Sequence, residues 1–212
     1  MKEKELRQIV KDAGVKLLQN KLVQGTWGNI SIRIDEKFMI VTPSGLDYIR
    51  MQVDDLVVVN IETLEYDPTI KPTGEKRIHA QIMLERPEVN AVIHSHPRNC
   101  SSLAAARVEL PIMTDEQKEL LGGEIRTGKY GLPGTKKLTK ATIEALKGRN
   151  ACFMANHGAV VCAPDMDLAF KMMSVLEDCA EKYIESKTME IAQTKEYKRK
   201  DLFDLFKAKH KK

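Results

Sequence analysis

The apolar residues near the N-terminus follow a helical period. Over residues 3–20 they recur at intervals of three and four, at Leu6, Ile9, Val10, Ala13, Leu17 and Leu18. This spacing places them on one face of an amphipathic helix. We expect that face to pack on a flat surface, because strand-like segments follow it in the chain.

Short β-rich runs separated by turn residues predict the strands of a sheet. The first three occupy residues 30–34, 38–42 and 56–61, and a candidate hairpin partner follows near Leu64. Three later runs, AVIHSH, ACFMA and GAVVCA, begin at residues 91, 151 and 158, and the last two are separated at NHG.

The segments between these runs are mostly helical in pattern. Ile78, Ile82 and Met83 share a helical face that ends before Pro87. We expect further helices over residues 97–107, 115–121, 135–147 and 165–190, and a long loop over residues 122–134. This mixed order predicts one compact α/β or α+β domain over residues 1–190.

Composition agrees with one globular domain, since 42% of the 212 residues are hydrophobic and 30% are charged. No apolar run approaches the roughly 20 residues of a membrane span, and MKEKELRQIV lacks the apolar block of a secretory signal. We therefore expect a cytoplasmic protein without membrane contact. The four cysteines form no C-x-x-C pair, which indicates reduced thiols and no thiolate zinc site.

The net charge of +4 comes from the C-terminus. Residues 195–212 carry eight Lys or Arg against three Asp or Glu, so the rest of the chain is near −1. A nucleic-acid-binding domain usually carries its basic residues clustered on the fold. We therefore expect no nucleic-acid partner and interpret residues 191–212 as a solvated basic tail that includes His210; binding of a polyanion or protein partner by this tail is the alternative.

His94 and His96 lie one residue apart at the end of a predicted strand. Residues i and i+2 of a strand point to one face, roughly 6.6 Å apart, so both imidazoles can reach one metal ion. Spacing alone leaves a hydrogen-bonded structural pair as an equal alternative. His157, in ANHGA, adds a third imidazole if Gly158 allows a tight turn, although a turn residue bonded to the backbone would look the same.

Glu75 opens a predicted helix after KPTG. It fits either a carboxylate that is stabilised near a helix N-terminus, or a fourth metal ligand or general base. His79 follows one helical turn later, and we expect it in the core or behind the site. Three glycine-polar turns, GTWGN, TPSGLDY and KPTGE, expose backbone N–H groups and hydroxyls that suit a small anion such as phosphate.

These motifs together resemble the class II aldolase/adducin-head family, most closely its L-fuculose-1-phosphate aldolases. The resemblance covers about residues 5–187 and is carried in order by GTWGNIS, VTPSGLDY, KPTGEKRIH, HSH, the segment from Gly122 to GLPGT, and NHG. It implies a central, largely antiparallel sheet flanked by helices. It also implies a homotetramer with active sites between subunits.

The resemblance further implies zinc, or another divalent metal, held by His94, His96, His157 and Glu75, with Glu75 also the catalytic acid/base. The substrate phosphate would lie against Gly28, Asn29, Ser44, Gly45, Thr73 and Gly74. The expected reaction is reversible cleavage of a ketose 1-phosphate, of the L-fuculose 1-phosphate type, to dihydroxyacetone phosphate and a small aldehyde such as lactaldehyde.

Some positions depart from the family pattern. Thr73-Gly74 stands where fuculose aldolases pair two serines, and Asp115 or Glu116 occupies the region of a tyrosine proton donor. A carboxylate there could serve as an acid if burial raised its pKa. A C-terminal family tyrosine also has no clear match in DLFDLFKAKHKK.

Three alternative functions are also compatible with the sequence. Pentulose-phosphate 4-epimerases resemble the chain but have aspartate in place of Glu75, whereas methylthioribulose-1-phosphate dehydratases keep glutamate. A non-catalytic adducin-like module would not need the histidines.

Overall fold

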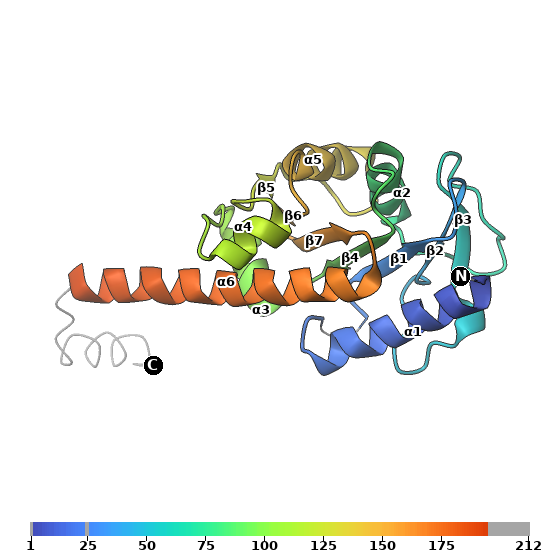
Figure 1. The fold of residues 1–212 in the computed structure, drawn as a ribbon, viewed down its shortest axis with the longest axis horizontal. Helices are drawn as coiled ribbons and strands as arrows, with labels where there is room; N and C mark the ends of the chain where they lie inside the picture. Colours follow the sequence, from blue (N-terminus) through green and yellow to red (C-terminus); the bar gives the residue numbers. More distant parts are fainter. Residues whose placement is uncertain (1, 24–25, 195–212) are drawn as a thin grey trace, which may run out of the picture.

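The computed structural model describes residues 2–23 and 26–194. A seven-stranded sheet runs through the centre of the protein in the order β3-β2-β1-β4-β7-β6-β5 (Figure 1). Its strands are β1 Asn29–Arg33, β2 Phe38–Val41, β3 Val57–Asn60, β4 Ala91–Ser95, β5 Thr127–Gly128, β6 Ala151–Met154 and β7 Gly158–Ala163. All neighbours are antiparallel except β5 and β6, so the expected largely antiparallel α/β fold is confirmed.

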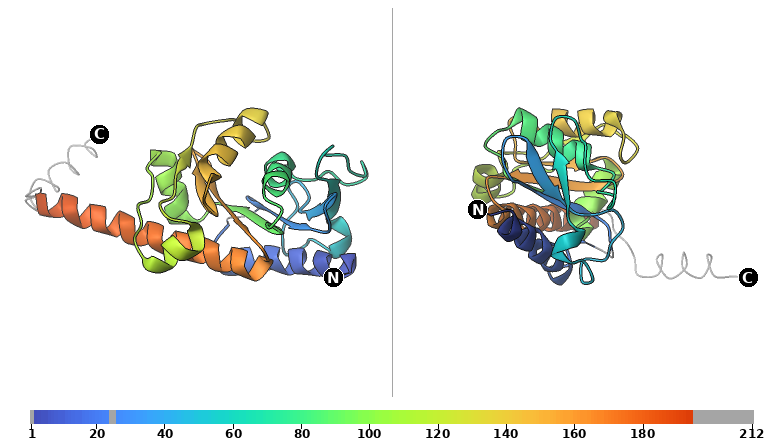
Figure 2. Two further views of the ribbon diagram at one scale, coloured as in Figure 1. Left: turned by 45° about the horizontal axis from the view of Figure 1, so that its top comes forward. Right: turned by 90° about the vertical axis from the view of Figure 1, so that its right-hand side faces the viewer.

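Six α-helices, within the residues described, cover the two faces of the sheet. They are α1 Glu3–Gln19, α2 Lys76–Glu85, α3 Arg98–Ala106, α4 Asp115–Leu121, α5 Lys136–Leu146 and α6 Met166–Thr194, with a 3-10 turn at Val53–Asp55. Helices α2 and α5 pack on one face, whereas α1, α3, α4 and α6 pack on the other (Figure 1, Figure 2). None of the helices described is long and apolar enough to cross a membrane.

Strand β4 lies in the middle of the sheet and has side chains buried on both faces. Ile93 packs toward the α1 and α6 side, whereas its neighbour Val92 packs toward α2 and α5. This period of two explains the continuous apolar run before the histidines. His94 falls on the face of Val92, which is the face that α2 covers.

Three details of the predicted elements differ from the structure. The expected loop over residues 122–134 contains β5, whose two residues pair in parallel with β6. Two residues are too few to give a periodic signal. Helix α6 continues past residue 190 to Thr194, across the predicted start of the tail, and residues 195–212 lie outside the described part of the chain. The hairpin partner near Leu64 is a single bridge between Val59 and Tyr66.

Candidate active site

The first two histidines lie where β4 ends, between β1 and β7. Backbone pairing sets His94 opposite Asn29 on one side and Val160 on the other. The Nδ1 atom of His94 lies 2.9 Å from the Ala159 carbonyl oxygen. Because a carbonyl only accepts, Nδ1 carries a proton, and Nε2 is the nitrogen that can face a metal.

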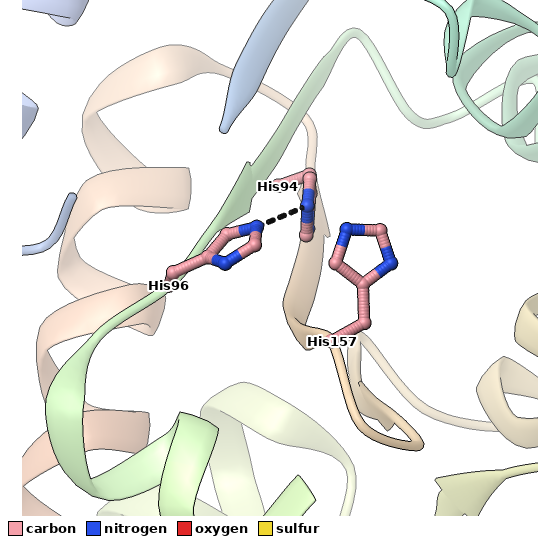
Figure 3. Close-up of side chains that lie close together, drawn as sticks. All are labelled: His94, His96 and His157. Atoms are coloured by element: carbon pink, nitrogen blue, oxygen red, sulfur yellow. Dashed lines mark hydrogen bonds between the residues drawn. The ribbon is translucent and has the colours of Figure 1, made fainter. Parts of the chain in front are cut away.

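His157 completes a group of three imidazoles from the turn between β6 and β7 (Figure 3). One ring nitrogen from each of His94, His96 and His157 lies within 4.8 Å of the others. The Nε2 atoms of His94 and His96 are 2.9 Å apart. Side chains distant in the sequence therefore face one another around a common point.

Gly158 serves this arrangement for a reason that differs from the prediction. The left-handed residue of the turn is Asn156, with φ of 59°. Gly158 is instead needed for room, because a Cβ there would lie 2.5 Å from the Ser95 carbonyl oxygen. The absence of a side chain lets the start of β7 approach the end of β4, which carries His94.

Glu75 immediately precedes α2 and turns its carboxylate toward the histidines. It is the N-cap residue of this helix and makes no side-chain cap hydrogen bond to it. Its Oε2 lies 3.3 Å from His94 Nε2 and accepts a hydrogen bond of 2.9 Å from Asn29 Nδ2. Its Oε1 lies 3.6 Å from His157 Nε2 and has no hydrogen-bond partner among the described residues.

The protonation of these groups favours metal binding. Burial alone would raise the pKa of Glu75, but the imidazoles of His94 and His157 and the Asn29 amide together hold that pKa below its usual value. Burial lowers the pKa of His96 to about 3 and that of His157 to about 4. An ionised carboxylate and neutral imidazoles are the forms that coordinate metals.

The residues present fit a divalent metal ion. Glu75 Oε1 and His157 Nδ1 are both buried and have no hydrogen-bond partner in the part of the chain that the structure describes, which is unusual for polar atoms unless an ion or ligand supplies one. Three imidazoles and one carboxylate form a donor set that zinc accepts. We call His94, His96, His157 and Glu75 the imidazole cluster.

His79 lies behind this cluster and is fully buried, as expected for a core or supporting residue. Its Nδ1 is 2.7 Å from Ser31 Oγ, and its Nε2 meets Asn29 Oδ1. Burial lowers the pKa of His79 to about 3, so its ring is neutral at neutral pH.

A cavity of about 320 Å³ adjoins the imidazole cluster. Every residue predicted to bind phosphate lines it, namely Gly28, Asn29, Ser44, Gly45, Thr73 and Gly74. Five further lining residues were not predicted as site residues, namely Thr26, Trp27, Pro43, Pro133 and Gly134. Pro133 and Gly134 belong to the GLPG motif, and that motif is the sequence signal from which they could have been found.

Two turns are held side by side along this cavity. Ser44 N donates to the Lys71 carbonyl at 2.9 Å, and Thr73 N donates to the Thr42 carbonyl at 3.0 Å. These bonds bring Ser44 and Gly45 next to Thr73 and Gly74. A Cβ added to either glycine would meet no atom within 4 Å. We call these four residues the turn cluster.

Comparison with known proteins assigns the family. Residues 8–184 match the family described as Class II Aldolase and Adducin N-terminal domain. The chain belongs to this family. The protein is a class II aldolase, a metal-dependent aldehyde-lyase, as its fold, the family match and the aldolases among its relatives indicate.

Three relatives show how far this likeness extends. A 5-methylthioribulose-1-phosphate/5-deoxyribulose-1-phosphate aldolase from Rhodospirillum rubrum is 33% identical, over 84% of this chain and 80% of that protein. A 5-deoxy-D-ribulose 1-phosphate aldolase from Bacillus thuringiensis is 31% identical, over 88% and 87%. The solved structure of an L-fuculose 1-phosphate aldolase superposes with a TM-score of 0.83 at 30% identity, covering 87% of each chain.

The structure separates Asp115 and Glu116 from the cavity of this aldolase. Both are exposed in the first turn of α4, and Glu116 pairs with Lys171 on α6 at 3.0 Å. Neither lines the cavity of its own chain. The burial that would make one of them an acid is therefore not provided within one subunit.

Proposed function

We propose that this class II aldolase is a zinc enzyme that reversibly cleaves a ketose 1-phosphate between C3 and C4. The products would be dihydroxyacetone phosphate and a short aldehyde. The observation that carries this proposal is the imidazole cluster beside a cavity that the turn cluster also lines. This arrangement offers a metal and an anion-binding surface to the same small molecule.

The imidazole cluster would hold the metal through His94, His96, His157 and Glu75. When bound, zinc supplies a Lewis acid that withdraws electrons from the substrate carbonyl. Imidazole nitrogens favour zinc over magnesium, which prefers oxygen ligands.

Glu75 would move the proton of the reaction. Its lowered pKa keeps it ionised at neutral pH, so in condensation it can accept a proton from the hydroxymethyl carbon of dihydroxyacetone phosphate, which becomes C3 of the ketose, and in cleavage it can return that proton to C3. Its Oε1 has no partner among the described residues and remains free for this exchange.

The phosphate would lie against Gly28, Asn29, Ser44, Gly45, Thr73 and Gly74. Backbone N–H groups and hydroxyls in such turns bind anions without a full positive charge. The turn cluster also leads into the N-terminus of α2, which favours negative charge. A phosphate held there would place the sugar carbons near the imidazole cluster.

Among ketose 1-phosphates, we place 5-deoxyribulose 1-phosphate first and L-fuculose 1-phosphate second. Two relatives above 30% identity carry 5-deoxyribulose 1-phosphate in their names. Cleavage of this substrate between C3 and C4 would give acetaldehyde. The missing serine at Gly74 and the missing tyrosine near Asp115 also weigh against a fuculose aldolase in the strict sense.

A homotetramer with active sites between subunits forms part of the proposal, supported by the resemblance and by the open cavity. A second subunit would then supply the proton donor that one chain lacks. The measurement is the molar mass in solution.

The test of function is a substrate panel with the purified protein. It should contain 5-deoxyribulose 1-phosphate, 5-methylthioribulose 1-phosphate and L-fuculose 1-phosphate, with dihydroxyacetone phosphate as the assayed product. We expect this product from at least one substrate, and a loss of about 100- to 10,000-fold in kcat for Glu75→Gln. Loss of water without a three-carbon product would instead identify a dehydratase.

A further inference from the structure

A chain of buried hydrogen bonds reaches the catalytic carboxylate from behind. It starts at Ser31 on β1, passes through His79 on α2 and Asn29 on β1, and ends at Glu75. From this geometry we infer that His79 is a positioning residue, which fixes the Glu75 carboxylate by orienting the Asn29 side chain. The inference rests on the proposed role of Glu75 in proton transfer.

The chemistry of its ends fixes the direction of every bond in this chain. An ionised carboxylate only accepts, so Asn29 must present its Nδ2 donor to Glu75. The Oδ1 atom of Asn29 then faces His79, and His79 Nε2 must carry the proton. Because the ring is neutral, Nδ1 accepts from the Ser31 hydroxyl at 2.7 Å.

The consequence is that His79 selects one orientation of the Asn29 amide. If the amide flipped, its oxygen would face the Glu75 carboxylate and its NH2 group would face the protonated Nε2 of His79. Both contacts would be repulsive. Since Ser31, Asn29 and His79 are all buried, water cannot easily take over the lost bonds.

Glu75 depends on this orientation more than a surface carboxylate would. Among the described residues, Asn29 is the one that donates a hydrogen bond to its carboxylate, because Oε1 has no partner. His79 and Glu75 are also tied through the same helix start, one turn apart. Loss of the Nε2 donor should therefore let Asn29 rotate and leave Glu75 without its anchor.

The same geometry limits how Asn29 contacts substrate. Both polar atoms of its side chain are engaged, one by Glu75 and one by His79. The second N–H of Nδ2 and the main chain of Asn29 remain for a phosphate contact. The bonds that depend on His79 are those that orient Glu75, so changes at His79 should lower kcat more than they raise KM for the substrate.

Two conservative variants separate positioning from packing. The amide nitrogen of His79→Gln can reach the place of Nε2 and still donate to Asn29, whereas the shorter amide of His79→Asn replaces Nδ1 and cannot. We expect His79→Asn to lose about 10- to 100-fold in kcat at saturating zinc, and His79→Gln to recover most of it. The thermal midpoint of unfolding should be measured for both.

A double-mutant cycle covers the case in which one variant folds poorly. Asn29→Ala removes the donor to Glu75 directly, so adding His79→Asn to it should lower kcat little further. Additive losses would overturn the inference. So would equal kcat values for His79→Asn and His79→Gln in folded protein, whether both are high or both are low.

Glu75→Gln in the same assay distinguishes the two proposals. If Glu75→Gln keeps wild-type kcat, the role of Glu75 fails, and the inference about His79 fails with it. If Glu75→Gln is inactive but His79→Asn turns over like wild type, the positioning role alone is wrong.

Discussion

The glycines that pack against the end of β4, next to the imidazole cluster, and those of the turn cluster lie in different surroundings. A Cβ on Gly158 would lie 2.5 Å from the Ser95 carbonyl oxygen, and one on Gly28 would lie 2.8 Å from the His94 carbonyl oxygen. A Cβ on Gly45 or Gly74 would meet nothing within 4 Å. The first pair is required by close packing of the protein on itself, and the second pair borders open space.

Under the proposed function, this difference would let one cavity serve two kinds of ligand. A metal site needs side chains held in fixed directions, so the strands that carry the histidines must pack tightly. An anion site needs exposed backbone N–H groups and room for the ligand. Substitutions in the first region should therefore change metal content and stability, whereas those in the second should change KM.

Removal of the metal should have the largest effect. Dialysis against a chelator is expected to lower the rate of cleavage more than about 100-fold, because Lewis-acid stabilisation amounts to several kcal/mol. Zinc should restore the activity and magnesium should not. Unchanged cleavage by protein shown to be free of metal would contradict the assignment of the imidazole cluster.

Gly158→Ala should disturb the metal site through packing. Its new methyl group must push β7 away from the end of β4, at a cost of about 1 to 3 kcal/mol in the free energy of unfolding. Bound metal should fall as His94 and His96 move. Gly74→Ala is the matched control, with the same added group and no loss of stability or metal; equal behaviour of the two variants would disprove the contrast.

Ser44→Ala should affect substrate binding alone. The loss of one hydroxyl bonded to a charged phosphate predicts a rise in KM of about threefold to tenfold at constant kcat and metal content. Steady-state kinetics against Ser186→Ala, which lies on α6 outside the cavity, provides the comparison. A fall in kcat with unchanged KM would remove Ser44 from the phosphate site.

Gly74→Ser should have the smallest effect. The added hydroxyl enters open space and restores a group that fuculose aldolases are expected to have, so KM should fall by up to about threefold. A clear rise in KM would show that the substrate itself fills that space.

Local features of the site could be predicted from the sequence, whereas features that depend on packing could not. His94 and His96 were recognisable because strand period places them together, and AVIHS of the predicted AVIHSH strand forms β4, with His96 directly after it. Resemblance to the family joined His157 and Glu75 to them. Asp115 was harder to place, because the expected acid role depends on burial, and burial depends on tertiary or quaternary packing.

Close packing was the other feature hidden from sequence. Gly158 was predicted to serve a tight turn, but its function is to make room for Ser95, a residue 63 positions away along the chain. Strand β5 was missed because two residues carry no period. The orientation of Asn29 likewise depends on His79 and Glu75 together, which no local pattern encodes.

The most direct test of the central claim is a crystal structure of the purified aldolase with anomalous diffraction measured on both sides of the zinc absorption edge. The account predicts one anomalous peak with a nitrogen of His94, His96 and His157 each about 2.0 to 2.1 Å away. Catalytically active crystals with no peak among these three imidazoles, or with the metal bound elsewhere, would contradict it.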